Sequence, residues 1–97
     1  MKLRELIEAV KEKHLSKDQL ELYRDDLSNL SAQMFLEMAD IEKLEALYAH
    51  SEGETEAAKN RKWFASPKGQ RQIELKNYIR ATDKILSSLK SRLYSMY

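Results

Sequence analysis

Cations and aromatic side chains gather between residues 59 and 71, in an arrangement that could bind a polyanion. The run Lys59-Asn60-Arg61-Lys62 leads directly into Trp63-Phe64 and is followed by Lys68 and Arg71. Lysine and arginine neutralise phosphates, and aromatic rings stack on the bases that a single strand exposes. The pattern therefore predicts a site for single-stranded nucleic acid. In the alternative, Trp63 and Phe64 cap a helical core and the cations are only solvated.

A second group of cations, Lys76, Arg80 and Lys84, repeats every four residues. Residues at this spacing lie along one face of an α-helix. A solvated face is the alternative, but such a face ordinarily mixes both charge signs, and this one carries almost only cations. We therefore predict these nucleic-acid contacts: Lys59, Arg61, Lys62, Trp63, Lys68, Arg71, Lys76, Arg80 and Lys84.

The two parts of the chain carry opposite charge. Residues 1–56 hold seven Lys/Arg and fourteen Asp/Glu, a net charge of −7, whereas residues 57–97 hold ten and two, a net charge of +8. The basic part is typical of a segment that meets a polyanion or an acidic protein. The alternative is internal, because an acidic helix could pack beside a basic helix and neutralise it.

No arrangement of side chains in the sequence predicts an enzyme. The chain has no cysteine and no phosphate-binding glycine motif, and His14 and His50 stand without a second ligand at helical spacing. Asp25 and Asp26 are adjacent, so on a helix they point about 100° apart and do not form an acid–base pair. We expect no catalytic residues, no bound metal and no cofactor.

Helices are expected throughout, because the chain of 97 residues contains only two Gly and one Pro, and its apolar residues recur every three to four positions. Residues 2–13 form a short amphipathic helix. Ser16 and Gln19 form a capping box at the start of the next helix. The polar residues near 28–31 predict a break, with Ser31 capping the helix that follows.

The remaining residues, 31–97, are expected to fold as a long antiparallel helical hairpin with its turn near residues 66–69. Pro67 and Gly69 mark that turn, and the best-defined helix spans about 70–97. The predicted fold is a single all-α domain with coiled-coil-like packing, in which residues 1–30 supply the N-terminal helices. We expect the core to contain Leu44, Tyr48, Leu75, Ile79, Leu86 and Leu89. Thr82 lies inside the apolar arc of the last helix.

The expected location is the cytoplasm, without contact with a membrane. No apolar run approaches the ~20 residues that span a bilayer. The N-terminal segment is amphipathic and lacks the pattern of a signal peptide, and a chain without cysteine needs no oxidising compartment.

The C-terminal two-thirds of the chain resembles the UvsY-type recombination mediators, small helical proteins of tailed phages. An acidic amphipathic helix over residues 41–48 leads into a basic stretch that ends in Trp63-Phe64. Gly69 and a lysine-rich helix over residues 73–97 follow. The resemblance implies binding of single-stranded DNA and of the single-strand-binding protein, and loading of a RecA-like recombinase from a ring-shaped homo-oligomer. It also implies that Lys59, Arg61, Lys62 and Trp63 contact the DNA.

These observations favour a non-enzymatic helical module that binds single-stranded nucleic acid, as a homo-oligomer and as a phage recombination mediator. The alternative is a protein–protein adaptor or inhibitor that docks on a larger host or phage complex. Pairing of the acidic residues 37–56 with Lys76, Arg80 and Lys84 would favour the alternative.

Overall fold

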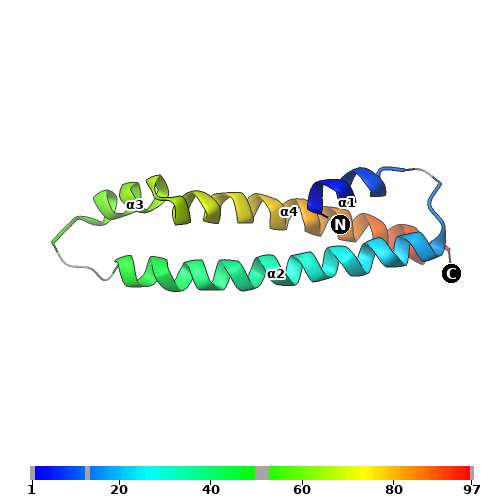
Figure 1. The fold of residues 1–97 in the computed structure, drawn as a ribbon, viewed down its shortest axis with the longest axis horizontal. Helices are drawn as coiled ribbons and strands as arrows, with labels where there is room; N and C mark the ends of the chain where they lie inside the picture. The colour runs from blue at the N-terminus through cyan, green and yellow to red at the C-terminus, as the bar shows by residue number, and fades with distance from the viewer. Residues whose placement is uncertain (1, 13, 50–52, 97) are drawn as a thin grey trace.

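The predicted all-α fold is confirmed. The structure, a computed structural model, describes residues 2–12, 14–49 and 53–96, of which 87% are helical. These residues form helices α1 (Leu3–Val10), α2 (Lys17–Ala49), α3 (Glu56–Ala65) and α4 (Pro67–Tyr94) (Figure 1). None of these helices is long and apolar enough to span a membrane.

The helices build an elongated antiparallel hairpin, 59 × 20 × 18 Å in extent. Helix α2 forms one arm, and α3 and α4 follow each other back along it to form the other (Figure 1). Helix α1 packs against both arms beside the C-terminal half of α4. In this half of the molecule three helices lie side by side, whereas in the other half only the two arms do; we call them the three-helix half and the two-helix half.

The predicted helix break near residues 28–31 is wrong, because α2 continues without interruption from Lys17 to Ala49. Ser28 and Asn29 are exposed, whereas Leu27 and Ser31 are buried and face the other helices. Continuous packing of this face outweighs the weak helix propensity of the polar residues. The predicted capping box is confirmed at the start of α2. The backbone N–H of Gln19 donates to the Ser16 hydroxyl at 3.2 Å, and the backbone N–H of Ser16 donates to Gln19 Oε1 at 2.9 Å.

The hairpin turn also differs from the prediction near residues 66–69. The chain reverses between Ala49 and Glu56, and the described part of this connection includes Gly53 with a φ of 93°. At Ser66 the chain passes from α3 to α4 and keeps its general direction (Figure 1). The Ser66 hydroxyl accepts from the Gly69 amide at 3.1 Å, and Pro67 occupies the first position of α4. Ser66 and Pro67 thus mark a helix start, as predicted, but not the reversal.

The core consists of two clusters along the hairpin. The cluster at the three-helix half contains Leu6, Leu15, Leu20, Leu27, Leu89 and Leu93. The cluster at the two-helix half contains Met34, Met38, Ile41, Trp63 and Leu75. Leu3, near the start of α1, packs against both clusters, so α1 begins where the two clusters meet.

Most of the predicted core residues lie in or beside these clusters. Leu75 and Leu89 are fully buried, and Tyr48, Ile79 and Leu86 are half-buried at the margins. Leu44 is 45% exposed, so the prediction that it lies in the core is wrong. A step of three residues falls about 60° short of a full helical turn. Leu44 is therefore rotated out of the face on which Ile41 lies.

Candidate nucleic-acid interface

Trp63 lies in the core and not on the surface. Its side chain is 7% exposed, and its indole Nε1 donates a hydrogen bond of 2.9 Å to Oε1 of buried Gln72. Its ring packs against Tyr48, with the ring centroids 6.1 Å apart. The predicted role of Trp63 in stacking on bases is therefore wrong. Because Gln72 satisfies the only polar group of the indole, the ring can be buried without cost to its N–H.

Phe64 differs from its neighbour, because its side chain is 37% exposed. Adjacent helical residues point about 100° apart, so α3 can bury only one of the two aromatic rings against α2 and α4. The sequence gives the same signal for both rings, and only the packing of α3 decides which is buried. Phe64 thus takes the exposed position that the sequence had indicated for Trp63.

Two of the predicted cations hold α3 to the end of α2 and to the connection between the two helices. Lys59 Nζ donates to the carbonyl of Ala49 at 3.1 Å, at the C-terminal end of α2, where the helix dipole favours a cation. Lys62 forms an ion pair and hydrogen bond with Glu54. This hydrogen bond and the charge of Glu54 raise the pKa of Lys62 above its ordinary value. Both side chains therefore have a structural role in this state of the protein.

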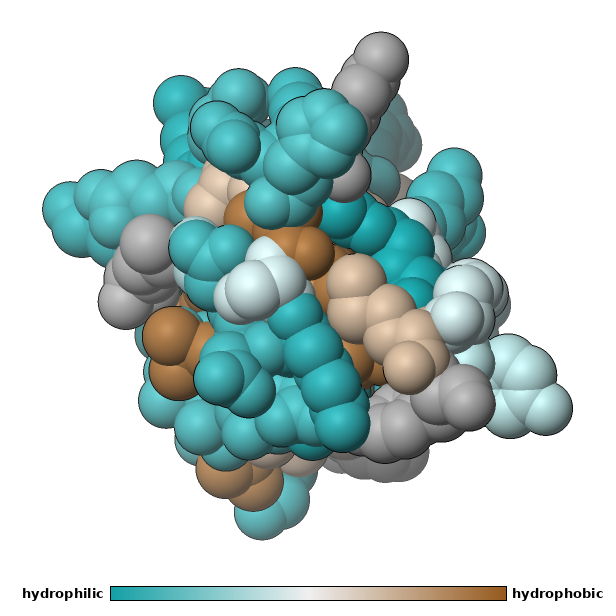
Figure 2. Space-filling model, turned by 90° about the vertical axis from the view of Figure 1, so that its right-hand side faces the viewer, coloured by the Kyte–Doolittle hydropathy of each residue, from teal (hydrophilic) through white to brown (hydrophobic). Residues whose placement is uncertain are grey.

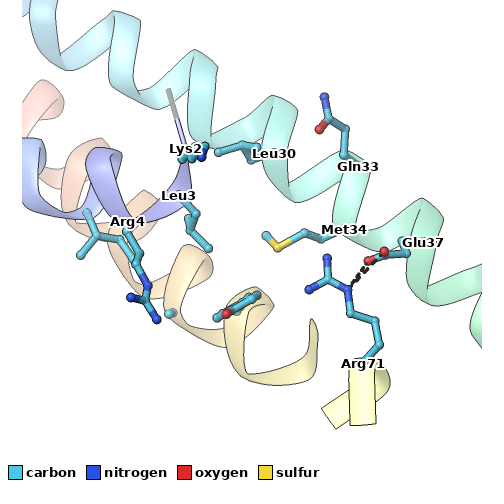
Figure 3. A pocket seen from close by; sticks show the side chains of 11 residues that line it. Lys2, Leu3, Arg4, Leu30, Gln33, Met34, Glu37 and Arg71 are labelled. Atoms are coloured by element: carbon cyan, nitrogen blue, oxygen red, sulfur yellow. Dashed lines mark hydrogen bonds and ion pairs between the residues drawn. The ribbon is translucent and has the colours of Figure 1, made fainter. Parts of the chain in front are cut away.

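Arg71 joins the two arms of the hairpin. Its Nε donates to Glu37 Oε2 at 2.9 Å (Figure 3). Its Nη1 pairs with Glu74 on the next turn of α4. Burial lowers the pKa of Arg71, but the hydrogen bonds and charges of Glu37 and Glu74 outweigh it and raise this pKa overall. The predicted pairing of the acidic and basic segments thus occurs at Arg71, as it does at Lys62.

The other five predicted cations are exposed: Arg61, Lys68, Lys76, Arg80 and Lys84. No hydrogen bond or ion pair joins the side chain of any of them to another group in the described part of the chain. Lys76, Arg80 and Lys84 lie on the side of α4 opposite the buried Leu75, Thr82 and Leu89, over about 12 Å of helix. We call these three residues the α4 stripe. No described carboxylate of residues 37–56 forms an ion pair with the α4 stripe.

Few acidic residues accompany the α4 stripe. Asp83 and Glu74 are the two carboxylates after residue 56, and Glu74 is already paired with Arg71. Ser87 and Ser91 are exposed and extend the face toward the C-terminus. Arg92, in contrast, is half-buried, and its guanidinium donates to the carbonyls of Val10 and Glu12 at 2.8 Å each. Arg92 therefore fixes the end of α1 to α4.

A groove of about 650 Å³ opens beside the first residues of α1 (Figure 3). Leu3 from α1, Leu30 and Met34 from α2, and Tyr78 from α4 line its apolar wall, and the Arg71–Glu37 pair lies at one end. The groove marks the point where α1 stops covering the seam between α2 and α4. Within the described residues, no three His, Asp or Glu side chains lie close enough together to hold a metal ion.

Comparisons of the chain with protein families, with curated proteins and with solved structures find no match.

Proposed function

We propose that this protein binds nucleic acid through the α4 stripe, with Arg61 and Lys68 extending the contact toward α3. The observation that supports this most is the set of three cations, spaced by four residues, for which the described residues supply no counterion. Cations on a rigid helix, with long flexible side chains, suit the regularly spaced phosphates of a nucleic acid backbone. Such contacts position a strand but do not read its sequence.

Binding would be driven by release of the counterions that condense on the phosphates. Each neutralised phosphate of a single strand contributes about −0.7 to the slope of log K against log salt. Three to five contacts, from the α4 stripe with or without Arg61 and Lys68, therefore give a slope of about −2 to −3.5. Binding of this kind requires no covalent bond to form, no metal and no cofactor.

A preference for single strands would come from Phe64. Its ring is partly exposed, and Arg61 lies three residues earlier on the same side of α3. An aromatic ring beside a cation can stack on an unpaired base while the cation meets the adjoining phosphate. We propose this pair in place of Trp63.

The wider role that the sequence resemblance implies belongs to the same proposal. The protein would act as a UvsY-type mediator, a homo-oligomer that holds single-stranded DNA for a recombinase. The all-α hairpin with a basic last helix is compatible with this role. The protein–protein adaptor is the second candidate, and the exposed leucines of α2 favour it.

The test is a fluorescence anisotropy titration of a labelled single-stranded oligonucleotide at several salt concentrations. The variant Lys76→Gln/Arg80→Gln/Lys84→Gln removes the α4 stripe. The matched control, Lys2→Gln/Arg4→Gln/Lys11→Gln, removes the same charge from exposed residues of the N-terminal segment. We expect the first variant to lose at least about tenfold in affinity at low salt and about two units of slope, and the control to lose much less.

Two results would contradict the proposal. One is a wild-type protein that does not bind the oligonucleotide at low salt, and the other is equal affinity of the two triple variants for the oligonucleotide. Either result would favour the adaptor. Competition with duplex DNA, compared for the wild-type protein and Phe64→Ala, tests the preference for single strands separately.

A further inference from the structure

The side of α2 that faces away from α4 carries large apolar residues in solvent. Leu36 and Leu47 are 70% and 71% exposed, and Leu44 beside them is also exposed. Figure 2, a view along the hairpin from the C-terminal end, shows hydrophobic atoms at its lower edge, the side on which α2 lies in Figure 1. Large apolar side chains on two opposite faces of a helix are typical of a helix that is buried on both sides.

The outer face has the spacing of a coiled-coil seam. Leu36, Asp40, Lys43 and Leu47 are separated by four, three and four residues, so they lie within an arc of about 60°. This arc is opposite the face of α2 that is buried in the core. Asp40 and Lys43 are exposed, and the side chain of neither makes a hydrogen bond or ion pair with another described residue. We call these four residues the outer seam.

The outer seam is complementary to itself when its direction is reversed. It reads apolar, acidic, basic, apolar, so an antiparallel copy places each leucine on a leucine and each acid on a base. We propose that two copies of this chain pair through their outer seams about a two-fold axis. Leu36 then packs on the partner's Leu47, and Asp40 pairs with the partner's Lys43. Both contacts occur twice, as a two-fold interface requires.

The surroundings of the outer seam fit this arrangement. Ala39 and Ala46 flank it on one side, and such small side chains let two helices approach closely. Exposed Leu44 adds apolar surface on the other side. In this register, residues 34–49 of the two α2 helices overlap over about 24 Å. A parallel pair would instead place each Asp40 on the partner's Asp40, so the charges select the antiparallel orientation.

This inference names an interface for the homo-oligomer of the proposed function, but it rests on the residues of α2 and not on nucleic-acid binding. The α4 stripe lies on the far side of the hairpin from the outer seam, so pairing would leave both copies of the stripe accessible. Failure to bind nucleic acid would not alter the expected dimer, and failure to dimerise would not alter the cations of α4.

Sedimentation equilibrium of charge variants tests the pairing. We expect the wild-type protein to dimerise between low micromolar and several hundred micromolar concentrations. Asp40→Lys or Lys43→Asp alone should weaken dimerisation by about tenfold or more, because both symmetry-related pairs change from attraction to repulsion. The double variant Asp40→Lys/Lys43→Asp should restore it, and a mixture of the two single variants should form heterodimers. Asp83→Lys, a matched charge change on exposed α4, should have no such effect.

Cysteine pairing tests the orientation, because the chain has no cysteine of its own. A mixture of Leu36→Cys and Leu47→Cys chains should form a disulfide-linked heterodimer under mild oxidation, and neither chain alone should. In the antiparallel register, the two copies of residue 36 are about 16 Å apart along the axis, beyond the reach of a disulfide. A monomeric wild-type protein at several hundred micromolar, no rescue by the double variant, or crosslinking of either chain alone would overturn the proposal.

Discussion

The hydrogen bond between Trp63 and Gln72 can be removed without emptying the core around it. Trp63→Phe keeps an aromatic ring but deletes the indole N–H, and so leaves Oε1 of Gln72, a residue only 2% exposed, without its donor. An unsatisfied buried polar group costs about 1–3 kcal/mol, and the smaller ring costs about 1 kcal/mol of lost burial. We therefore expect Trp63→Phe to lower the free energy of unfolding by about 2–4 kcal/mol.

Gln72→Leu supplies the second arm of a double-mutant cycle. Alone, it leaves the indole N–H without an acceptor, whereas Trp63→Phe/Gln72→Leu removes both polar groups together. The double variant should be about 1–2 kcal/mol more stable than the sum of the single effects predicts. Urea unfolding followed by far-ultraviolet circular dichroism measures all four proteins, because tryptophan fluorescence is lost with Trp63. A coupling energy within about 0.3 kcal/mol of zero would refute the reasoning.

Two further substitutions probe the contacts between helices. Gly69→Ala should destabilise the fold by about 2 kcal/mol or more, because a Cβ here would collide with the Trp63 carbonyl and lie 2.8 Å from the Phe64 Cα. This loss outweighs the gain of about 1 kcal/mol that alanine normally brings to a helix. A stable Gly69→Ala protein in urea unfolding would contradict this packing of α3 on α4. Arg92→Ala should cost about 1–3 kcal/mol and speed proteolysis within residues 2–16, because the guanidinium holds two carbonyls at the end of α1. Arg92→Lys should recover only part of the loss, since one ammonium cannot reproduce the planar fork, and full recovery would show that charge alone suffices.

The last helix could be predicted well because its apolar period is unbroken. Leu75 and Leu89 of the predicted core and Thr82 of the predicted arc are all buried. Helix α2 is harder to predict, because large apolar residues lie both on its inner face and in its outer seam, so periodicity alone does not identify the core face. Local composition was also misleading there, since the polar residues near 28–31 sit on the solvent side of a continuous helix.

The roles of the individual cations could be predicted only in part. Arg71 and Arg80 look alike in the sequence, yet Arg71 meets Glu37 of α2 and Arg80 points into solvent. That difference depends on the register between α2 and α4, which follows from where the chain reverses. Placing the reversal near 66–69 shifts this register, so the pairing of Arg71 could not be foreseen. Which of Trp63 and Phe64 is buried likewise depends on the rotation of α3 about its own axis.

The incomplete cover that α1 provides has a consequence for the dynamics of the hairpin. Where α1 lies against α2 and α4, each arm has two neighbours, whereas α3 and the facing end of α2 have fewer packed contacts. Segments with fewer buried contacts open at lower free energy, and their amides exchange with solvent sooner. Helix α3 and the facing turns of α2 should therefore form a separate, weaker cooperative unit. Phe64 and Arg61 belong to that unit, so a strand bound there would meet the part of the protein that adjusts most readily to its shape.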